Sequence, residues 1–242
     1  MRRHSNGNGN QHNRQIPEKT MLCVAMLAPA AYAEEVWKIT SLDWQPYSGA
    51  DMATQGNSIQ KLRELLKREG ITLQVDFFPW ARAKDVAKSK EYVGFFPAWP
   101  EEVDKGFVAS PAVDQSEIGV LKNSASKVTF KDVDDLFKNY TVGIVKTYVY
   151  PQDITNAAKK YPKNTDGAMT EESLLQKLAK GRHQTAITDP SVMLYLAGKQ
   201  GIDNVEAVQV LTKKDLVIAL RDDEENKARI ARLQKILANA RK

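Results

Sequence analysis

The stretch that decides the fold runs from Ile71 to Pro111 and reads ITLQVDFFPWARAKDVAKSKEYVGFFPAWPEEVDKGFVASP. Apolar and polar residues alternate from Ile71 to about Phe78, which is the pattern of a half-buried strand. Residues 80–88 then predict a short helix with one apolar face. The continuous apolar run at residues 92–96 is too short for a helix and predicts a strand that is covered on both faces.

A strand, a helix and a parallel strand in this order form the unit from which open sheets with helices on their faces are built. In such sheets, ligands bind beyond the carboxyl ends of the strands. We therefore expect a ligand site near residues 78–82 and 97–103.

The first 33 residues differ from the rest of the chain. Residues 1–20 are polar and contain arginine, and a short apolar run from Met21 ends in Ala31-Tyr32-Ala33. This order is typical of a secretory signal peptide, and we expect cleavage after Ala33 and a soluble periplasmic product. The run is too short to span a bilayer. The alternative interpretation is a buried segment of the folded protein.

Removal of residues 1–33 changes the charge and the reactive side chains. The segment holds four of the 35 Lys and Arg and one of the 30 Asp and Glu, which leaves 31 against 29 and a net charge of +2. Basic residues are mixed with acidic ones, so we expect no nucleic acid as a partner. Cys23 is lost and His183 is the one histidine that remains. This composition excludes disulfides, cysteine nucleophiles and the usual zinc sites, and we expect no metal and no cofactor.

The alternation of strands and helices continues and appears twice, which predicts an α/β protein with two lobes. Further strands are expected at residues 36–42, 117–122, 141–145, 185–188, 205–210 and 215–220. Further helices are expected at residues 58–69 with Asn57 or Ser58 as the cap, 132–137, 153–161, 171–180 with Thr170 as the cap, 190–197 and 224–240. The chain is expected to cross between lobes near residues 117–123 and 211–216. Lobe 1 then comprises residues 34–118 plus 212–242, and lobe 2 comprises residues 119–211.

Several short motifs add a family resemblance across residues 36–240. They are Trp44-Gln45-Pro46-Tyr47, Gly56, Phe77-Phe78-Pro79-Trp80, Glu101-Glu102 leading to Ser110-Pro111, Asp135-Leu136 leading to Val142-Gly143-Ile144, and Leu178-Ala179-Lys180-Gly181-Arg182 leading to Thr188-Asp189. In this order they resemble the extracellular solute-binding proteins of family 3, periplasmic receptors that mostly serve amino-acid ABC transporters. The resemblance implies a two-lobed periplasmic binding protein type II fold. Each lobe would be a mostly parallel sheet flanked by helices, with two hinge strands between the lobes, which close over a small polar ligand.

One departure from the family concerns the ligand. In its amino-acid binders an arginine follows the acidic pair and grips the ligand carboxylate, whereas Val103 follows Glu101-Glu102 in this chain. A neutral side chain cannot replace a bidentate guanidinium. Trp80-Ala81-Arg82-Ala83 resembles a segment of a family branch whose members often lack a well-defined ligand. The sequence therefore leaves the ligand open.

Aromatic side chains are the first candidate ligand contacts. Trp44, Tyr47, Trp80 and Trp99 fall at or near the ends of predicted strands of lobe 1. Their flat faces suit a sandwiched ligand or a cation. The alternative for each of them is packing in the core.

Polar candidates come from both lobes. The resemblance implies that Asp189 holds a ligand ammonium group, and the alternative is that it caps the following helix. Arg82 is a candidate anion contact, or else a solvated helix arginine that bridges to Asp85. Thr147 and Tyr148 follow a predicted strand, where hydroxyls and amides accept an anion; the alternative there is a polar loop.

Three functions fit these residues. The first is a monomeric periplasmic binding protein that delivers a small polar ligand, an amino acid or a related compound, to the membrane permease of an ABC transporter. The second is a receptor module whose partner is a sensor protein. The third is an enzyme, because a few relatives of the fold catalyse dehydrations. Without cysteine, and with His183 expected at the surface, we expect no catalytic residues and no enzyme.

Overall fold

The computed structural model describes residue 7 and residues 35–240. Apart from Gly7, the predicted signal peptide and its cleavage site after Ala33 lie outside the described residues. The same holds for residues 34, 241 and 242 of the predicted lobe 1. Within the described part of the chain, no helix is both long enough and apolar enough to cross a membrane.

A single mixed sheet runs through the described chain. Its strands follow the order β2-β1-β3-β9-β5-β8-β6-β7, and β4 also pairs with β9. Parallel pairs form both ends of the sheet, while β9 is antiparallel to its neighbours. The strands are β1 (Glu35–Ser41), β2 (Ile71–Phe77), β3 (Gly94–Ala98), β4 (Phe107–Ala109), β5 (Asp114–Asn123), β6 (Val142–Val145), β7 (Thr165–Ala168), β8 (Thr185–Thr188) and β9 (Val205–Arg221).

The opening stretch folds as its pattern predicts. β2, helix α2 (Trp80–Val86) and β3 follow one another, and β1 lies between the two strands and is parallel to both. Ala83 is buried, and its carbonyl accepts a hydrogen bond of 2.8 Å from the Thr40 hydroxyl on β1. Every residue of β3 is buried, as the continuous apolar run predicts.

The two connecting strands are β5 and β9, which pair along residues 114–123 and 205–216. The prediction of separate strands at residues 205–210 and 215–220 is wrong, because β9 continues through the polar Thr212 and Lys213. These two residues pair with Ile118 and Glu117 of β5, so the partner strand keeps the backbone extended where the apolar pattern stops. The strands β4 and β7 were not predicted, because β4 is only three residues long and β7 lacks an apolar run.

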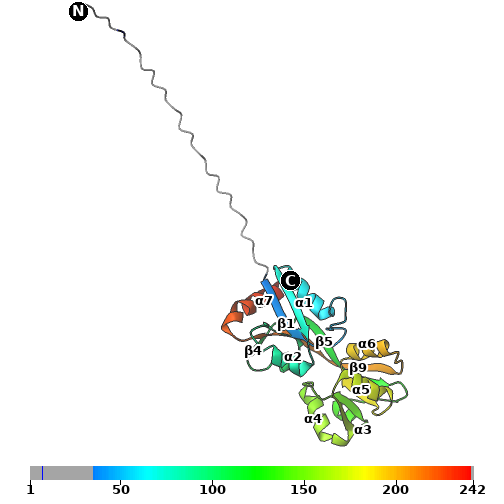
Figure 1. Cartoon of the computed structure of the whole chain (residues 1–242). Helices are drawn as coiled ribbons and strands as arrows, with labels where there is room; N and C mark the ends of the chain where they lie inside the picture. The colour runs from blue at the N-terminus through cyan, green and yellow to red at the C-terminus, as the bar shows by residue number, and fades with distance from the viewer. Residues whose placement is uncertain (1–6, 8–34, 241–242) are drawn as a thin grey trace, which may run out of the picture. The chain divides into compact units, whose positions relative to one another are not determined.

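Helices gather at both ends of the connecting strands. Helices α3, α4, α5 and α6 lie toward one end of β5 and β9, and α1, α2 and α7 lie toward the other (Figure 1). Their bounds, other than that of α2, are α1 (Asn57–Lys67), α3 (Val133–Asn139), α4 (Gln152–Lys160), α5 (Glu171–Ala179), α6 (Pro190–Gln200) and α7 (Lys227–Ala240). Short 3₁₀ turns are formed by η1 (Pro100–Glu102), η2 (Pro162–Asn164) and η3 (Glu224–Asn226).

Helix starts depend on caps that the sequence predicts only in part. Thr170 caps α5 as predicted, with its hydroxyl accepting from the Ser173 amide at 3.2 Å. The predicted cap of α1 is wrong, because Gly56 occupies that position without a side-chain bond. Gly56 has a φ of 107°, and a Cβ there would lie 2.4 Å from the Tyr47 carbonyl oxygen, so only glycine fits.

Candidate functional site

The loops that follow β1, β2 and β6 meet the first turn of α5 around a cavity of about 530 Å³. This volume lies within the roughly 300–1,000 Å³ of typical small-molecule sites. The cavity is lined by Leu42, Asp43, Trp44, Gln45, Phe77, Phe78, Pro79, Trp80, Ala81, Val145, Thr147, Tyr148, Met169, Thr170, Glu171, Glu172, Val192 and Leu196. Residues assigned to both predicted lobes therefore share one cavity.

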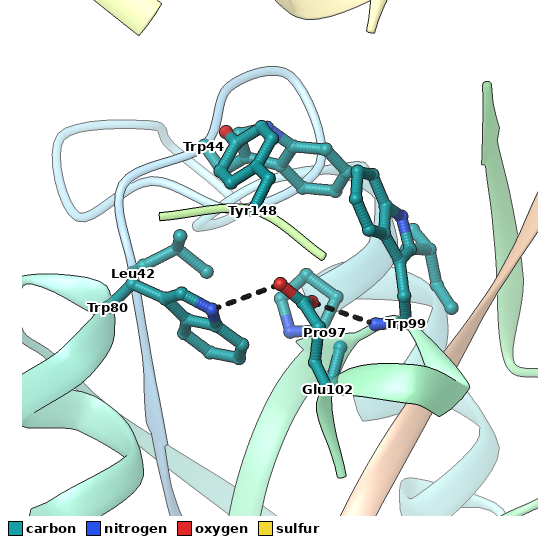
Figure 2. A pocket seen from close by; sticks show the side chains of 9 residues that line it. Leu42, Trp44, Trp80, Pro97, Trp99, Glu102 and Tyr148 are labelled. Atoms are coloured by element: carbon teal, nitrogen blue, oxygen red, sulfur yellow. Dashed lines mark hydrogen bonds between the residues drawn. The ribbon is translucent and has the colours of Figure 1, made fainter. Parts of the chain in front are cut away.

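A narrow recess of about 20 Å³ adjoins this cavity and has room for a water molecule. It is lined by Leu42, Trp44, Trp80, Pro97, Ala98, Trp99, Glu102, Tyr148 and Leu216. Four residues, Leu42, Trp44, Trp80 and Tyr148, line both spaces. Figure 2 shows Trp80 and Trp99 on two sides of Glu102, with Trp44 and Tyr148 across the recess from it.

The aromatic rings form a connected wall. The ring of Trp99 meets that of Trp44 edge to face at 6.2 Å between centroids, and that of Tyr148 at 5.4 Å. Tyr47 packs behind Trp44 at 4.6 Å. The Trp99 indole donates to the Ser116 hydroxyl at 2.9 Å, whereas the buried indole nitrogen of Trp44 makes no hydrogen bond within the described chain. The wall is thus fixed by packing, and its Trp99 indole is also held by a hydrogen bond.

Glu102 is a buried carboxylate at the recess. Its Oε1 accepts from the Trp80 indole at 3.3 Å, and its Oε2 accepts from the Trp99 amide at 3.1 Å (Figure 2). Burial raises the pKa of Glu102, and those two donors oppose the rise. Glu102 therefore holds the Trp80 indole and the backbone of Trp99 in place.

Glu171 is a second buried carboxylate and lines the main cavity. It is 6% exposed, and its Oε1 accepts a hydrogen bond from the Thr188 hydroxyl. Its Oε2 makes no hydrogen bond to any described residue. Burial raises the pKa of Glu171 to about 7, although the nearby hydroxyls of Thr188 and Tyr148 oppose the rise. A buried acceptor without a donor is costly, so this oxygen is suited to receive a donor from a ligand.

Comparison with known proteins gives the fold. No protein-family model and no curated protein matches the sequence. Solved structures do match: a histidine kinase sensor domain with similarity to periplasmic binding proteins has a TM-score of 0.71 and 17% identity, covering 86% of this chain and 91% of that chain. An ancestral arginine-binding protein bound to arginine has a TM-score of 0.69 and 14% identity, with coverage of 85% and 92%. The ligand-binding core of GluR0 in complex with L-glutamate has a TM-score of 0.67 and 16% identity, with coverage of 85% and 93%.

The chain has the two-lobed fold of periplasmic binding proteins. The predicted fold class is therefore confirmed, and the sequence resemblance agrees with the solved structures that match. The exact division of residues between the lobes stays a prediction.

Five of the predicted site residues surround the cavities of this periplasmic binding fold. Trp44, Trp80 and Tyr148 line both spaces, Trp99 lines the recess, and the exposed Thr147 lines the main cavity. The rule that ligands bind beyond strand ends found all of them. Their contact with a ligand stays a prediction.

Asp189 and Tyr47 lie behind the cavity wall. Asp189 is fully buried and caps α6, with its Oδ1 accepting from the amides of Ser191 at 2.8 Å and Val192 at 3.0 Å. Its Oδ2 accepts from the Tyr47 hydroxyl at 3.1 Å and from the Glu117 amide at 2.9 Å. With four protein donors, its carboxylate acts here as a helix cap and as a link between α6, β5 and the loop after β1.

Arg82 lies on the exposed side of α2 and does not line either cavity. Its guanidinium carbon sits 5.4 Å from the centroid of the Phe78 ring, which does line the main cavity. Arg82 is thus a neighbour of the wall and no part of it.

His183 is buried, so its predicted surface position is wrong. Its Nδ1 lies 3.3 Å from Asp166 Oδ2, and its Nε2 packs where a Cβ on Gly143 would come within 2.5 Å. Burial lowers the pKa of His183. The sequence did not predict β7, the strand that carries Asp166. Among the described residues, no cluster of His, Cys, Asp and Glu could hold a metal ion.

Sequence reasoning missed the acidic residues of the site. Glu102 served only as a landmark of the family resemblance, although its place after a strand was a usable signal. Glu171 reads as an ordinary acid in the first turn of a helix, which is favourable on any helix. Its burial comes from packing against residues distant in sequence, such as Thr188.

Proposed function

We propose that this protein is a periplasmic solute-binding protein that captures a small polar ligand in the 530 Å³ cavity. The observation that carries the proposal is the cavity itself, which residues of both predicted lobes line within a periplasmic binding fold. Solved structures of similar fold are described as binding arginine or glutamate. A cavity shared in this way can couple occupancy to the relative position of the lobes.

Direct contacts support such coupling. Trp99 of the predicted first lobe packs on Tyr148 of the predicted second lobe, and Tyr47 bonds to Asp189. A ligand adds further contacts between the two lobes, and it can make them only when the lobes are closed around it. Closure is then a population shift whose size is set by those added contacts.

We place the protein in the periplasm and propose the permease of an ABC transporter as its partner. The predicted signal peptide and the fold support this assignment. A second candidate is a sensor protein, because a histidine kinase sensor domain has a TM-score of 0.71 to this chain. Co-purification from cells, with a permease and its ATPase or with a kinase, separates the two candidates.

We propose binding without catalysis. Of the described residues that line the two cavities, none is a histidine, cysteine or lysine. Without these side chains, the lining lacks the commonest nucleophiles and suits recognition better than nucleophilic attack.

A thermal-shift screen of the purified protein tests the proposal. Amino acids, amines, small acids and sugars are added singly, and a hit at about 100 times its dissociation constant should raise the melting temperature by roughly 5–10 °C. Small-angle scattering of each hit should show a smaller radius of gyration. No stabilisation by any compound of these classes would contradict the proposed function.

A further inference from the structure

The charged groups around the two cavities share one sign. Among the described residues that line them, the ionisable acids are Asp43, Glu102, Glu171 and Glu172, and no lysine, arginine or histidine joins them. Such a lining creates a negative potential, which attracts cations and repels anions. A free carboxylate on a ligand would meet repulsion here and no guanidinium partner.

Two lysines close to the recess are each paired with a carboxylate. Lys214 is 2.6 Å from Glu101, and Lys84 is 3.2 Å from Asp104, so each is paired with a carboxylate outside the lining. Their ammonium groups lie 5.6 Å from the Trp99 ring centroid and 5.7 Å from that of Trp80. The indoles of Trp80 and Trp99 thus already attract cations from the protein itself.

Glu171 supplies a second, independent observation that favours a cationic ligand. Its side chain is nine-tenths buried, lines the main cavity and leaves Oε2 without a hydrogen-bond donor in the described chain. An ammonium or guanidinium group would supply both the missing donor and the compensating charge. Trp44 and Tyr148 line the same space and offer faces that favour a cation.

Val103 lies outside the lining of this space. It is half-buried and packs on a small apolar cluster that includes Ala87, Phe95 and Ala98. The residue that follows the acidic pair thus supports the back of β3 and contributes nothing to the cavity lining.

We propose that the ligand is an organic cation that carries no carboxylate, held by Glu171 against the aromatic wall. This inference rests on the proposed function and narrows its ligand class. An α-amino acid is disfavoured, because its carboxylate has no partner in the lining. We expect the cavity to bind the corresponding amine, which lacks the carboxylate, more tightly.

Matched pairs test this directly by isothermal titration calorimetry on the whole protein. Cadaverine is compared with L-lysine, agmatine with L-arginine, and tyramine with L-tyrosine, so that the members of each pair differ by one carboxylate. We expect at least one amine to bind at least about tenfold more tightly than its amino acid, which is about 1.4 kcal/mol.

The variants Glu171→Gln and Glu224→Gln complete the experiment. Glu171→Gln keeps an oxygen for the Thr188 hydroxyl, and it should weaken amine binding at least about tenfold with the fold intact by circular dichroism. Glu224 is 84% exposed on η3 and away from the cavities, so Glu224→Gln should change affinity less than about twofold.

The outcomes separate the two proposals. Tighter binding of amines that depends on Glu171 supports the inference. Tighter binding of the amino acids, or amine affinity that is equal in Glu171→Gln, overturns the inference and leaves the proposed function standing. Absence of binding by all six compounds overturns the inference, and absence across the wider screen overturns the proposed function as well.

Discussion

The Tyr47 hydroxyl donates a hydrogen bond of 3.1 Å to Asp189, across a sequence distance of 142 residues. This bond ties the loop after β1 to the first turn of α6. Asp189 is fully buried, and its carboxylate has three other donors, all backbone amides. The pair is therefore a fixed link between elements that the sequence assigns to different lobes.

We expect Tyr47→Phe to weaken this link. The substitution keeps the ring against Trp44 and removes one of the four donors, so the free energy of unfolding should fall by about 1 kcal/mol. Denaturant unfolding measures the loss. Tyr195→Phe on α6 is the control, because that hydroxyl makes no hydrogen bond in the described chain, and it should change stability by less than about 0.5 kcal/mol. Equal effects of the two variants would contradict a specific role for the link.

Gly56→Ala should destabilise the protein through the same loop. Gly56 has a φ of 107°, and an added Cβ would approach the Tyr47 carbonyl oxygen to 2.4 Å. Strain of this kind costs about 1–3 kcal/mol before the clash is counted. Gly198→Ala is the matched control, since Gly198 is helical with nothing within 4 Å of the added Cβ, and it should stabilise by about 0.5–1 kcal/mol. Opposite signs in thermal unfolding are the expected result, and a shared sign would be inconsistent with this account.

The aromatic part of the site follows from sequence, and the acidic part does not. Trp44, Trp80, Trp99 and Tyr148 stand near strand ends, and a strand end can be found from local periodicity together with Pro and Gly. Whether Glu171 is buried depends on how α5 packs against β8, which no local pattern encodes.

The incorrect predictions about the fold also concern features that contacts between distant residues decide. β9 was divided because its middle is polar, although pairing with β5 keeps it continuous. His183 follows the end of a helix beside Arg182, which favours a surface position, but Gly143 of β6 and Asp166 of β7 lie beside its ring in the fold. For Asp189, the sequence offered the capping role as one of two interpretations. Its bond to Tyr47 depends on the fold and could not be predicted from local sequence.

Stability should depend on pH through Glu171. Its pKa is raised from an ordinary 4.5 to about 7 in the folded protein, so the folded state keeps a proton that the unfolded state has released. The stabilisation is complete below pH 4.5 and is lost as the pH rises toward 7, by up to about 3 kcal/mol. Buried Glu102 and Asp189 have raised pKa values and act in the same direction.

The variant Glu171→Gln isolates that contribution. It remains neutral at every pH, so the difference in unfolding free energy between the variant and the parent should grow in favour of the variant between pH 4.5 and 7. Denaturant unfolding at several pH values measures this difference. A constant difference over that range would mean that Glu171 does not titrate there.

The predicted signal peptide gives a prediction that does not depend on the ligand site. If residues 1–33 act as a signal peptide, expression of the full chain in a Gram-negative bacterium should yield a periplasmic protein whose first residue is Glu34. Cell fractionation and intact-mass measurement check both points. Replacing Ala31 and Ala33 with bulky charged residues should block processing, because the cleavage site requires small side chains. A full-length mass in the wild-type periplasm would contradict the assignment.

The last prediction joins the titration of Glu171 to ligand charge. The groups that face it are the hydroxyls of Thr188 and Tyr148 and the carboxylates of Asp189 and Glu172, none of which is a cation. A bound cation would therefore be the change that favours its ionised form.

At about pH 6, one unit below the pKa of Glu171, the free protein mostly holds the proton, and a cationic ligand must displace it. Calorimetry with the tightest-binding amine of the three pairs, repeated in buffers of different ionisation enthalpy, counts the protons released. Close to one proton should leave at about pH 6 and far less at about pH 8, and Glu171→Gln should remove this difference. If wild type and variant release the same number at both pH values, the ligand cation does not rest on Glu171, even if amines bind.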